Sequence, residues 1–306
     1  MSVLAIIAAL VIEQWRPLGE RKSVSGALAG WATYLERAFN GGERQHGMVA
    51  WLVAVLPPVA VAIVLHALFA AAGWVFALVF DIAVLYLTLG FRQFSHYFTD
   101  IQLAVKSGDI ERARALLEQW RGASGVVRSR EEVIRLSIEE ALVAAHRHVF
   151  GVLLWYLILP GPGGAILYRL AAYLAARWKH RGAFGRFAEQ AFHILEWPAV
   201  RLTAAAFALV GDFENTVYCW RTQAPTWADP DAGIVLAAGA GAMGVRLGMP
   251  VQEVDGLQPR PELGVGEEAD GPFLDTTVGM LWRALVLWVA ILAGAGLVSY
   301  IARFGF

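Results

Sequence analysis

The feature that most constrains the fold is an apolar run that ends at a turn made of proline and glycine. The run covers residues 149–159 and is 11 residues long, whereas a helix that crosses a membrane needs about 20. It stops at Pro160-Gly161-Pro162-Gly163-Gly164, and a second apolar stretch, 165–178, follows at once. We therefore expect a broken or re-entrant helical hairpin over residues 148–178.

The residues before the hairpin predict a helix that brings charge to the edge of the apolar layer. Residues 130–150 contain no Gly or Pro, and their apolar positions recur at helical spacing. The helix carries Glu139, Glu140, His146, Arg147 and His148. Because the two histidines are only two positions apart, they do not share a helix face, and we expect no zinc site.

The composition is that of an integral membrane protein. Hydrophobic residues make up 58% of the 306 residues and charged residues 17%, against about 45–50% and about 25% in soluble domains. The formal net charge of −1 gives no electrostatic basis for nucleic-acid binding. The early apolar segment lacks the basic start and the cleavage site of a signal peptide, so we treat it as a membrane segment.

The hydrophobic pattern predicts an all-α fold, namely a polytopic membrane helical bundle formed by one membrane domain over residues 1–306. An amphipathic helix is expected at 24–39, a polar helical segment at 92–147, and a mobile loop at 251–272, which is rich in Pro, Gly and acids. Asp229 is expected to cap a helix of small residues that runs through Leu247. The expected membrane spans are 3–12, 48–72, 74–90, 194–210 and 279–301.

Lysine and arginine suggest an orientation for these segments. Segments 13–47, 92–147 and 177–186 are basic and are expected on the cytoplasmic side. The acidic segment 212–275 would lie on the far side, unless the 194–210 helix is re-entrant. Pro57 and Pro58 should kink the first long span.

Several motifs, taken in order, resemble the CobD/CbiB family of cobalamin-biosynthesis membrane proteins. They are Gly108-Asp109 with Ala113-Arg114, Leu153-Leu154-Trp155 before the Pro160–Gly164 turn, Tyr168-Arg169, Arg201-Leu202-Thr203, Asp229-Pro230-Asp231-Ala232-Gly233 and Gly244-Val245-Arg246-Leu247-Gly248. The stretch from His193 to Leu202, together with Arg147, is similar to AmpE, a related inner-membrane protein associated with β-lactamase regulation. The resemblance implies a multi-pass protein of the bacterial inner membrane, with the lipid bilayer as its surroundings.

For the cobalamin enzymes, this resemblance implies ATP-dependent formation of an amide between adenosylcobyric acid and an amino alcohol or its phosphate. Such chemistry needs magnesium held by carboxylates. In the acidic run of the family, Glu139 is kept here, but Val143, Ala144 and Arg147 stand where an acid, an amide and an acid are expected. Replacing carboxylates by arginine changes the field of such a site from metal-binding to anion-accepting.

We therefore expect a catalytically divergent member that binds an anionic or amphipathic ligand, a corrinoid or another anionic small molecule, in a cytoplasm-facing cavity, with a regulatory or accessory role. The arginines would bind a carboxylate or phosphate, the glutamates would orient them or bind a cation, and the histidine would act as donor or switch. The candidate ligand-binding residues are Glu139, Arg147, Tyr168, Arg169, His193, Glu196 and Arg201. Each of them could equally serve helix packing or interfacial anchoring.

Two alternatives stay open. A synthase with a rearranged site would use ATP and magnesium, and its metal ligands would have to come from Glu139, Glu140, Asp229 and Asp231. A transporter would explain the intramembrane Asp81, which could also simply bond a neighbouring helix. No metal-binding or Walker motif is present, Cys219 is expected to be inert, and the sequence leaves open the identity of the ligand and whether chains form a homo-oligomer.

Overall fold

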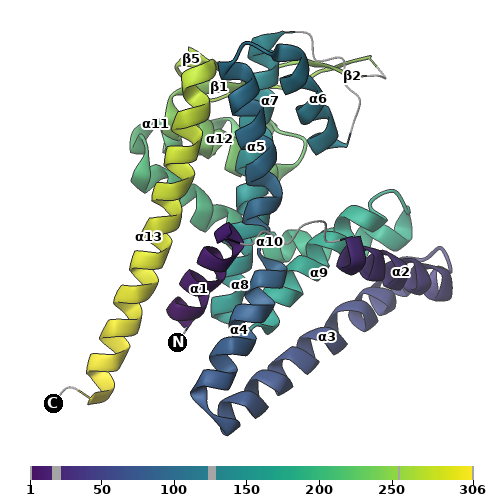
Figure 1. The fold of residues 1–306 in the computed structure, drawn as a ribbon. Helices are drawn as coiled ribbons and strands as arrows, with labels where there is room; N and C mark the ends of the chain where they lie inside the picture. Colours follow the sequence, from purple (N-terminus) through teal and green to yellow (C-terminus); the bar gives the residue numbers. More distant parts are fainter. Residues whose placement is uncertain (1, 16–21, 123–128, 254–255, 305–306) are drawn as a thin grey trace. The chain divides into compact units, whose positions relative to one another are not determined.

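The protein is almost entirely helical, as predicted, and its chain forms two compact units (Figure 1). The computed structural model describes residues 2–15, 22–122, 129–253 and 256–304. Unit 1 comprises Met1–Gly90 and Arg147–Pro198, and unit 2 comprises Phe91–His146 and Ala199–Phe306. The chain passes from one unit to the other after Gly90, His146 and Pro198. That these units form one membrane domain stays a prediction.

Unit 1 is built from helices that pair as hairpins. The helix α3 pairs with α4 across Gly73 and also packs against α9, while α1 lies along α4 (Figure 1). The helix α3 continues through Pro57 and Pro58 without a break. The elements of unit 1 are α1 (Ser2–Trp15), α2 (Lys22–Phe39), α3 (Arg44–Ala72), α4 (Trp74–Thr88), α8 (Gly151–Ile158), α9 (Gly163–Trp178) and the first part of α10 (Ala183–Val210).

The predicted helical hairpin is present as α8 and α9, joined by a turn at residues 159–162. Gly161 has a φ of 58°, which favours glycine. Gly164 lies so close to the backbone of Trp155 that a side chain there would overlap the Trp155 carbonyl oxygen. The glycines of this turn therefore allow the two helices to approach closely.

The first arm of the hairpin is longer than the sequence analysis expected. The helix α7 (Arg130–Ala145) passes through a π-helical turn, η1 (His146–Phe150), directly into α8. Together they form a helical run of 29 residues that is apolar and long enough to cross a membrane. The apolar run at 149–159 looked too short because the same helix begins among the charged residues before it.

In unit 2, α7 is the central helix. It packs against α5, α6, α12, α13 and the strand β1 (Figure 1). Its buried side chains include Val133, Leu136 and Ala141, as the predicted apolar face requires. The other elements are α5 (Phe91–Lys106), α6 (Ile110–Arg121), the end of α10, α11 (Phe213–Thr222), η2 (Ala224–Thr226), α12 (Pro230–Met243), β1 (Val245–Gly248), β2 (Val251–Glu253), β3 (Gly256–Gln258), β4 (Glu262–Leu263), β5 (Glu267–Glu268) and α13 (Gly271–Phe304).

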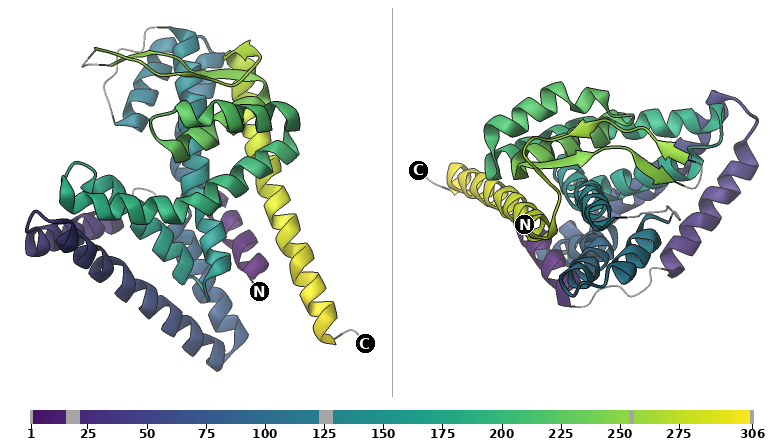
Figure 2. Two further views of the ribbon diagram at one scale, coloured as in Figure 1. Left: turned by 180° about the vertical axis from the view of Figure 1, so that it is seen from behind. Right: turned by 90° about the horizontal axis from the view of Figure 1, so that it is seen from above.

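The strands correct two predictions. The helix expected to run through Leu247 ends at Met243, because Gly244 adopts a left-handed conformation that stops it. The segment expected as a loop, 251–272, contains the short strands β2 to β5. The strand β1 precedes it and pairs antiparallel with β4 and parallel with β5, while β2 pairs with β3. The strand β1 packs against α12 and α7, and β4 packs against α12; Figure 2 shows this end of the chain from two further directions. The predicted cap is present, since Asp229 accepts hydrogen bonds from the first turn of α12.

The described helices are those of a multi-pass membrane protein. Four of them are long and apolar enough to cross a bilayer, at Arg44–Ala72, Arg130–Ile158, Ala183–Val210 and Gly271–Ala295. Ser2–Trp15 and Trp74–Thr88 are shorter apolar helices. Large apolar side chains of α3 point outward, with Leu56, Val61, Val64 and Leu68 all more than half exposed. A lipid environment accounts for that surface, because water would not favour it.

Candidate functional site

The π-helical turn η1 sets the positions of the charged residues that precede the hairpin. One extra residue per turn rotates the side chains that follow, and such turns are frequent at functional sites. Here the turn contains His146, Arg147 and His148. The Nδ1 atom of His146 lies 3.0 Å from the Thr203 hydroxyl in unit 2, whereas Arg147 and His148 belong to unit 1.

Arg147 forms an ion pair with a buried carboxylate. Its Nε donates to Oε1 of Glu196 on α10 at 3.0 Å, and the Glu196 side chain is only 3% exposed, against 34% for Arg147. The guanidinium also lies over the Phe192 ring, 5.8 Å from its centre. Glu196 therefore holds the guanidinium of Arg147 through its Nε atom.

A second arginine lies on the neighbouring helix α9. Arg169 donates from Nη1 to Nδ1 of His148 at 2.8 Å, so this nitrogen of His148 acts as an acceptor. The preceding residue, Tyr168, is fully buried and packs on the Phe192 ring, 5.5 Å between ring centres. Gly151 leaves the space that this tyrosine ring fills. Tyr168 therefore holds the Phe192 ring in place from the buried side.

These residues form a basic site in unit 1, which we call the Arg147 site: Arg147, His148, Arg169, Phe192, His193 and Glu196. His193 is exposed on α10, next to Phe192. The site contains two arginines and one carboxylate, so it carries net positive charge. Guanidinium groups bind carboxylates and phosphates with paired hydrogen bonds, and the aromatic ring offers an apolar surface beside them. This chemistry suits an anionic group attached to an apolar body.

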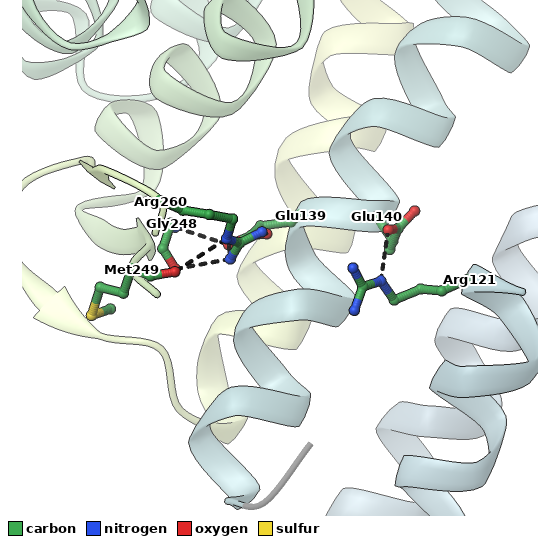
Figure 3. A network of polar contacts seen from close by, with 6 residues as sticks. All are labelled: Arg121, Glu139, Glu140, Gly248, Met249 and Arg260. Atoms are coloured by element: carbon green, nitrogen blue, oxygen red, sulfur yellow. Dashed lines mark hydrogen bonds and ion pairs between the residues drawn. The ribbon is translucent and has the colours of Figure 1, made fainter. Parts of the chain in front are cut away.

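Glu139 lies in unit 2 and has a different environment (Figure 3). Both of its oxygens accept hydrogen bonds from Arg260, from Nη1 at 2.9 Å and from Nη2 at 3.2 Å. The backbone N–H of Gly248 adds a third bond at 2.8 Å. Arg260 in turn donates to the carbonyls of Gly248 and Met249 and lies over the Trp227 ring. We call this arrangement the Glu139–Arg260 pair.

The other acids considered for a metal site are engaged separately. Glu140 points away from Glu139 and accepts a bond from Arg121 at 3.3 Å (Figure 3). The Asp229 side chain accepts from the backbone N–H groups of Asp231 and Ala232. Over the part of the chain that the structure describes, no three acidic, histidine or cysteine side chains converge as metal ligands. This donor set does not fit a carboxylate-held magnesium ion.

The predicted site residues fall in both units. Arg147, Tyr168, Arg169, His193 and Glu196 belong to unit 1, whereas Glu139 and the half-buried Arg201 belong to unit 2. Sequence reasoning missed Phe192 and His148 as parts of the site and Arg260 as the partner of Glu139. A usable signal for Arg260 existed, since it is one of few cations in an acidic segment.

Comparison with known proteins identifies the family. The model of the family described as CobD/Cbib protein matches residues 3–281. The chain belongs to the CobD/CbiB family. It is similar to the cobalamin biosynthesis protein CobD of Stutzerimonas stutzeri, at 35% identity over 97% of this chain and 99% of that protein. The CobD of Chromobacterium violaceum is 37% identical over 80% of this chain and 83% of its own length.

More distant relatives carry the same name. The CobD of Mycobacterium tuberculosis is 32% identical over 62% of this chain and 61% of its own length. The search of solved structures found no match. The family expected from the motifs is thus confirmed, while the similarity to AmpE stays a prediction.

Proposed function

We propose that this CobD/CbiB-family protein acts in the membrane as a catalytically divergent, ligand-binding member. The ligand is an anionic, amphipathic small molecule, and a corrinoid intermediate of cobalamin biosynthesis is the first candidate because the relatives carry that pathway in their names. The Arg147 site binds its acidic group. The role of the protein is regulatory or accessory.

The observation that carries this proposal is the ion pair between Arg147 and Glu196. Glu196 is buried and bonds to Nε of Arg147, at the inner edge of the guanidinium. A third of the arginine side chain is exposed. A guanidinium held in this way is pre-organised, so that binding an anion costs little side-chain entropy. Arg169 adds a second positive charge in the same unit.

The Glu139–Arg260 pair supports the proposal that the protein has diverged from the synthases in its catalytic function. In the synthase alternative, Glu139 would have to hold magnesium, yet two nitrogens of Arg260 and one backbone N–H already occupy its oxygens. These three contacts use most of the acceptor sites of the carboxylate, so a metal ion would compete with them. The positive charge of Arg260 would also oppose a cation beside it.

The binding experiment compares matched arginine variants. Purified protein is equilibrated with a carboxylated corrinoid, and the bound fraction is read from its visible absorbance. Arg147→Gln should weaken binding about tenfold or more, because it removes a charge-assisted contact. Arg147→Lys should retain part of the affinity. Replacing the exposed Arg186 by Gln is the control and should change nothing. Equal affinity in wild type and Arg147→Gln would contradict the proposal.

The synthase remains the second candidate, because similarity to a protein named for cobalamin biosynthesis extends over nearly the whole chain. A strain that lacks its cobalamin synthase separates the two functions. If the protein is catalytically divergent, this strain should not grow under conditions that require cobalamin synthesis, even when the protein is present in its membrane. Growth that is lost on Glu139→Ala, with the variant still present in the membrane, would establish the synthase instead.

A further inference from the structure

Unit 1 contains a second polar site, which the Arg147 site does not include. It is a pocket of about 390 Å³ between α1, α3, α4 and the turn that follows α8. Three of its lining residues, His66, Asp81 and Tyr156, carry ionisable side chains, and Ser2 adds a hydroxyl. Most of the remaining wall is apolar and includes Ala70, Ala77, Leu78 and Ile158.

The carboxylate of Asp81 is held in place by two other helices. Its Oδ1 lies 2.8 Å from Nδ1 of His66 on α3, and its Oδ2 accepts a hydrogen bond from the Tyr156 hydroxyl on α8 at 2.9 Å. The Asp81 side chain is 8% exposed and that of His66 is 25% exposed. No lysine or arginine is among the residues that line the pocket. The pocket wall therefore carries a fixed acid without a permanently charged partner.

The end of a long helix adds negative potential to the same pocket. The helical run that begins at Arg130 ends at Ile158, and residues 157–159 line the pocket. The C-terminal end of a helix carries the negative end of its dipole and stabilises cations. The acid and the helix terminus are independent features, and both favour positive charge at this point.

We propose that this pocket binds a small monovalent cation, either a hydrated alkali-metal ion or a short alkylammonium ion. Both have one positive charge for Asp81 and groups that can bond to the Ser2 and Tyr156 hydroxyls. A divalent ion would require more carboxylate ligands than the pocket supplies. The apolar wall accommodates either water around a metal ion or the alkyl group of an amine.

The pocket is also separated from the basic end of its unit. That end is marked by Arg44, where α3 begins, and by Lys179 and Arg181, which follow α9. The pocket lies toward the opposite ends of these helices, where Gly161 of the hairpin turn packs on His66. Since basic ends stay in the cytoplasm, the cation would enter from the other face of the membrane.

Thermal unfolding of the purified full-length protein tests this inference. Sodium, potassium and methylammonium chloride are titrated at constant ionic strength, with N-methylglucamine chloride making up the difference. A bound cation stabilises the folded state, so the melting temperature should rise and saturate. Saturation by sodium or potassium alone identifies an alkali-metal ion, and saturation by methylammonium alone identifies an amine. Either result supports the site.

Two variants and a control locate the effect. Asp81→Asn keeps the shape of the side chain but removes its charge, and should abolish the rise. Ala70→Phe narrows the pocket without touching Asp81, and should weaken methylammonium binding about tenfold. Glu43→Gln removes an exposed carboxylate outside the pocket and should leave the rise unchanged. The absence of a saturable rise in wild type, or an equal rise in Asp81→Asn, would overturn the proposal.

Discussion

Two arginine–glutamate pairs, one in each unit, use the same residue types for different purposes. In both, the glutamate is buried, with a side-chain exposure of 3% for Glu196 and 7% for Glu139. Arg260 is bonded through Nε and both terminal nitrogens, to one carboxylate and two carbonyls. Arg147 meets its glutamate through Nε and is more exposed. We propose that the Glu139–Arg260 pair stabilises the fold, whereas Glu196 orients Arg147 for an anionic ligand.

The largest expected effect is the loss of the Glu139–Arg260 pair. Arg260→Ala leaves a buried carboxylate without its cation and should lower the free energy of unfolding by about 3–5 kcal/mol. Unfolding of the purified protein by heat or denaturant measures the change. As a control, Lys106→Ala breaks an exposed ion pair with Asp275 and should cost at most about 1 kcal/mol. Equal losses in the two variants would mean that the Glu139–Arg260 pair is not structural.

A smaller loss of stability is expected at the Arg147 site. Arg147→Gln should cost about 1–3 kcal/mol, because Glu196 loses a charged partner while water near the exposed arginine screens part of the effect. Arg147→Gln should also lower the affinity for the anionic ligand. A conservative substitution of Arg260, which lies outside the Arg147 site, should leave that affinity unchanged. Measuring stability and binding on both variants tests the comparison. It would fail if Arg147→Gln destabilised the protein as much as Arg260→Ala does.

The Trp227 ring, over which Arg260 lies, should contribute less to the free energy of unfolding than the Glu139–Arg260 pair does. Trp227→Ala removes a cation–π contact 5.1 Å from the ring centre and should cost about 0.5–2 kcal/mol beyond the loss of apolar burial. Trp227→Phe keeps an aromatic face and should recover part of this. A double-mutant cycle with Arg260→Ala measures the coupling. A coupling of zero would show that the ring does not stabilise the arginine.

The smallest effect is expected at Cys219, whose reactivity should be low. This cysteine is buried in unit 2 and belongs to neither arginine–glutamate pair. Burial raises the pKa of its thiol, so less thiolate is present at any given pH. A thiol reagent at pH 8 should therefore modify the folded protein much more slowly than free cysteine, and the rate should rise only at higher pH. The unfolded protein, which should react quickly, is the control. Rapid modification of the folded protein would show that the Cys219 thiol is not buried.

The sequence predicted the helical class, the hairpin turn and the cap at Asp229, because these depend on local chemistry. Glycine and proline stop helices wherever they occur, and an aspartate before a helix bonds its first N–H groups. The π-helical turn could not be predicted in this way. It lies within one helical run from Arg130 to Ile158, at the point where the sequence changes from charged to apolar.

The candidate site was predicted only in part, since it depends on contacts between distant segments. Arg147 and Glu196 were both selected, but their pairing crosses 49 positions and follows from the packing of α10. The partner of Glu139 is 121 positions away, in a segment that looked like a loop. Composition indicated a turn-rich segment there, whereas the strands that carry Arg260 to α7 depend on pairing between short runs.

The most direct test measures two ligands on one preparation of the purified protein. A carboxylated corrinoid and magnesium–ATP are each titrated into wild type, Arg147→Gln and Glu139→Gln. The account predicts corrinoid binding that depends on Arg147 and is retained in folded Glu139→Gln. Magnesium-dependent nucleotide binding that disappears in a folded Glu139→Gln variant and is unaffected by Arg147→Gln would contradict it.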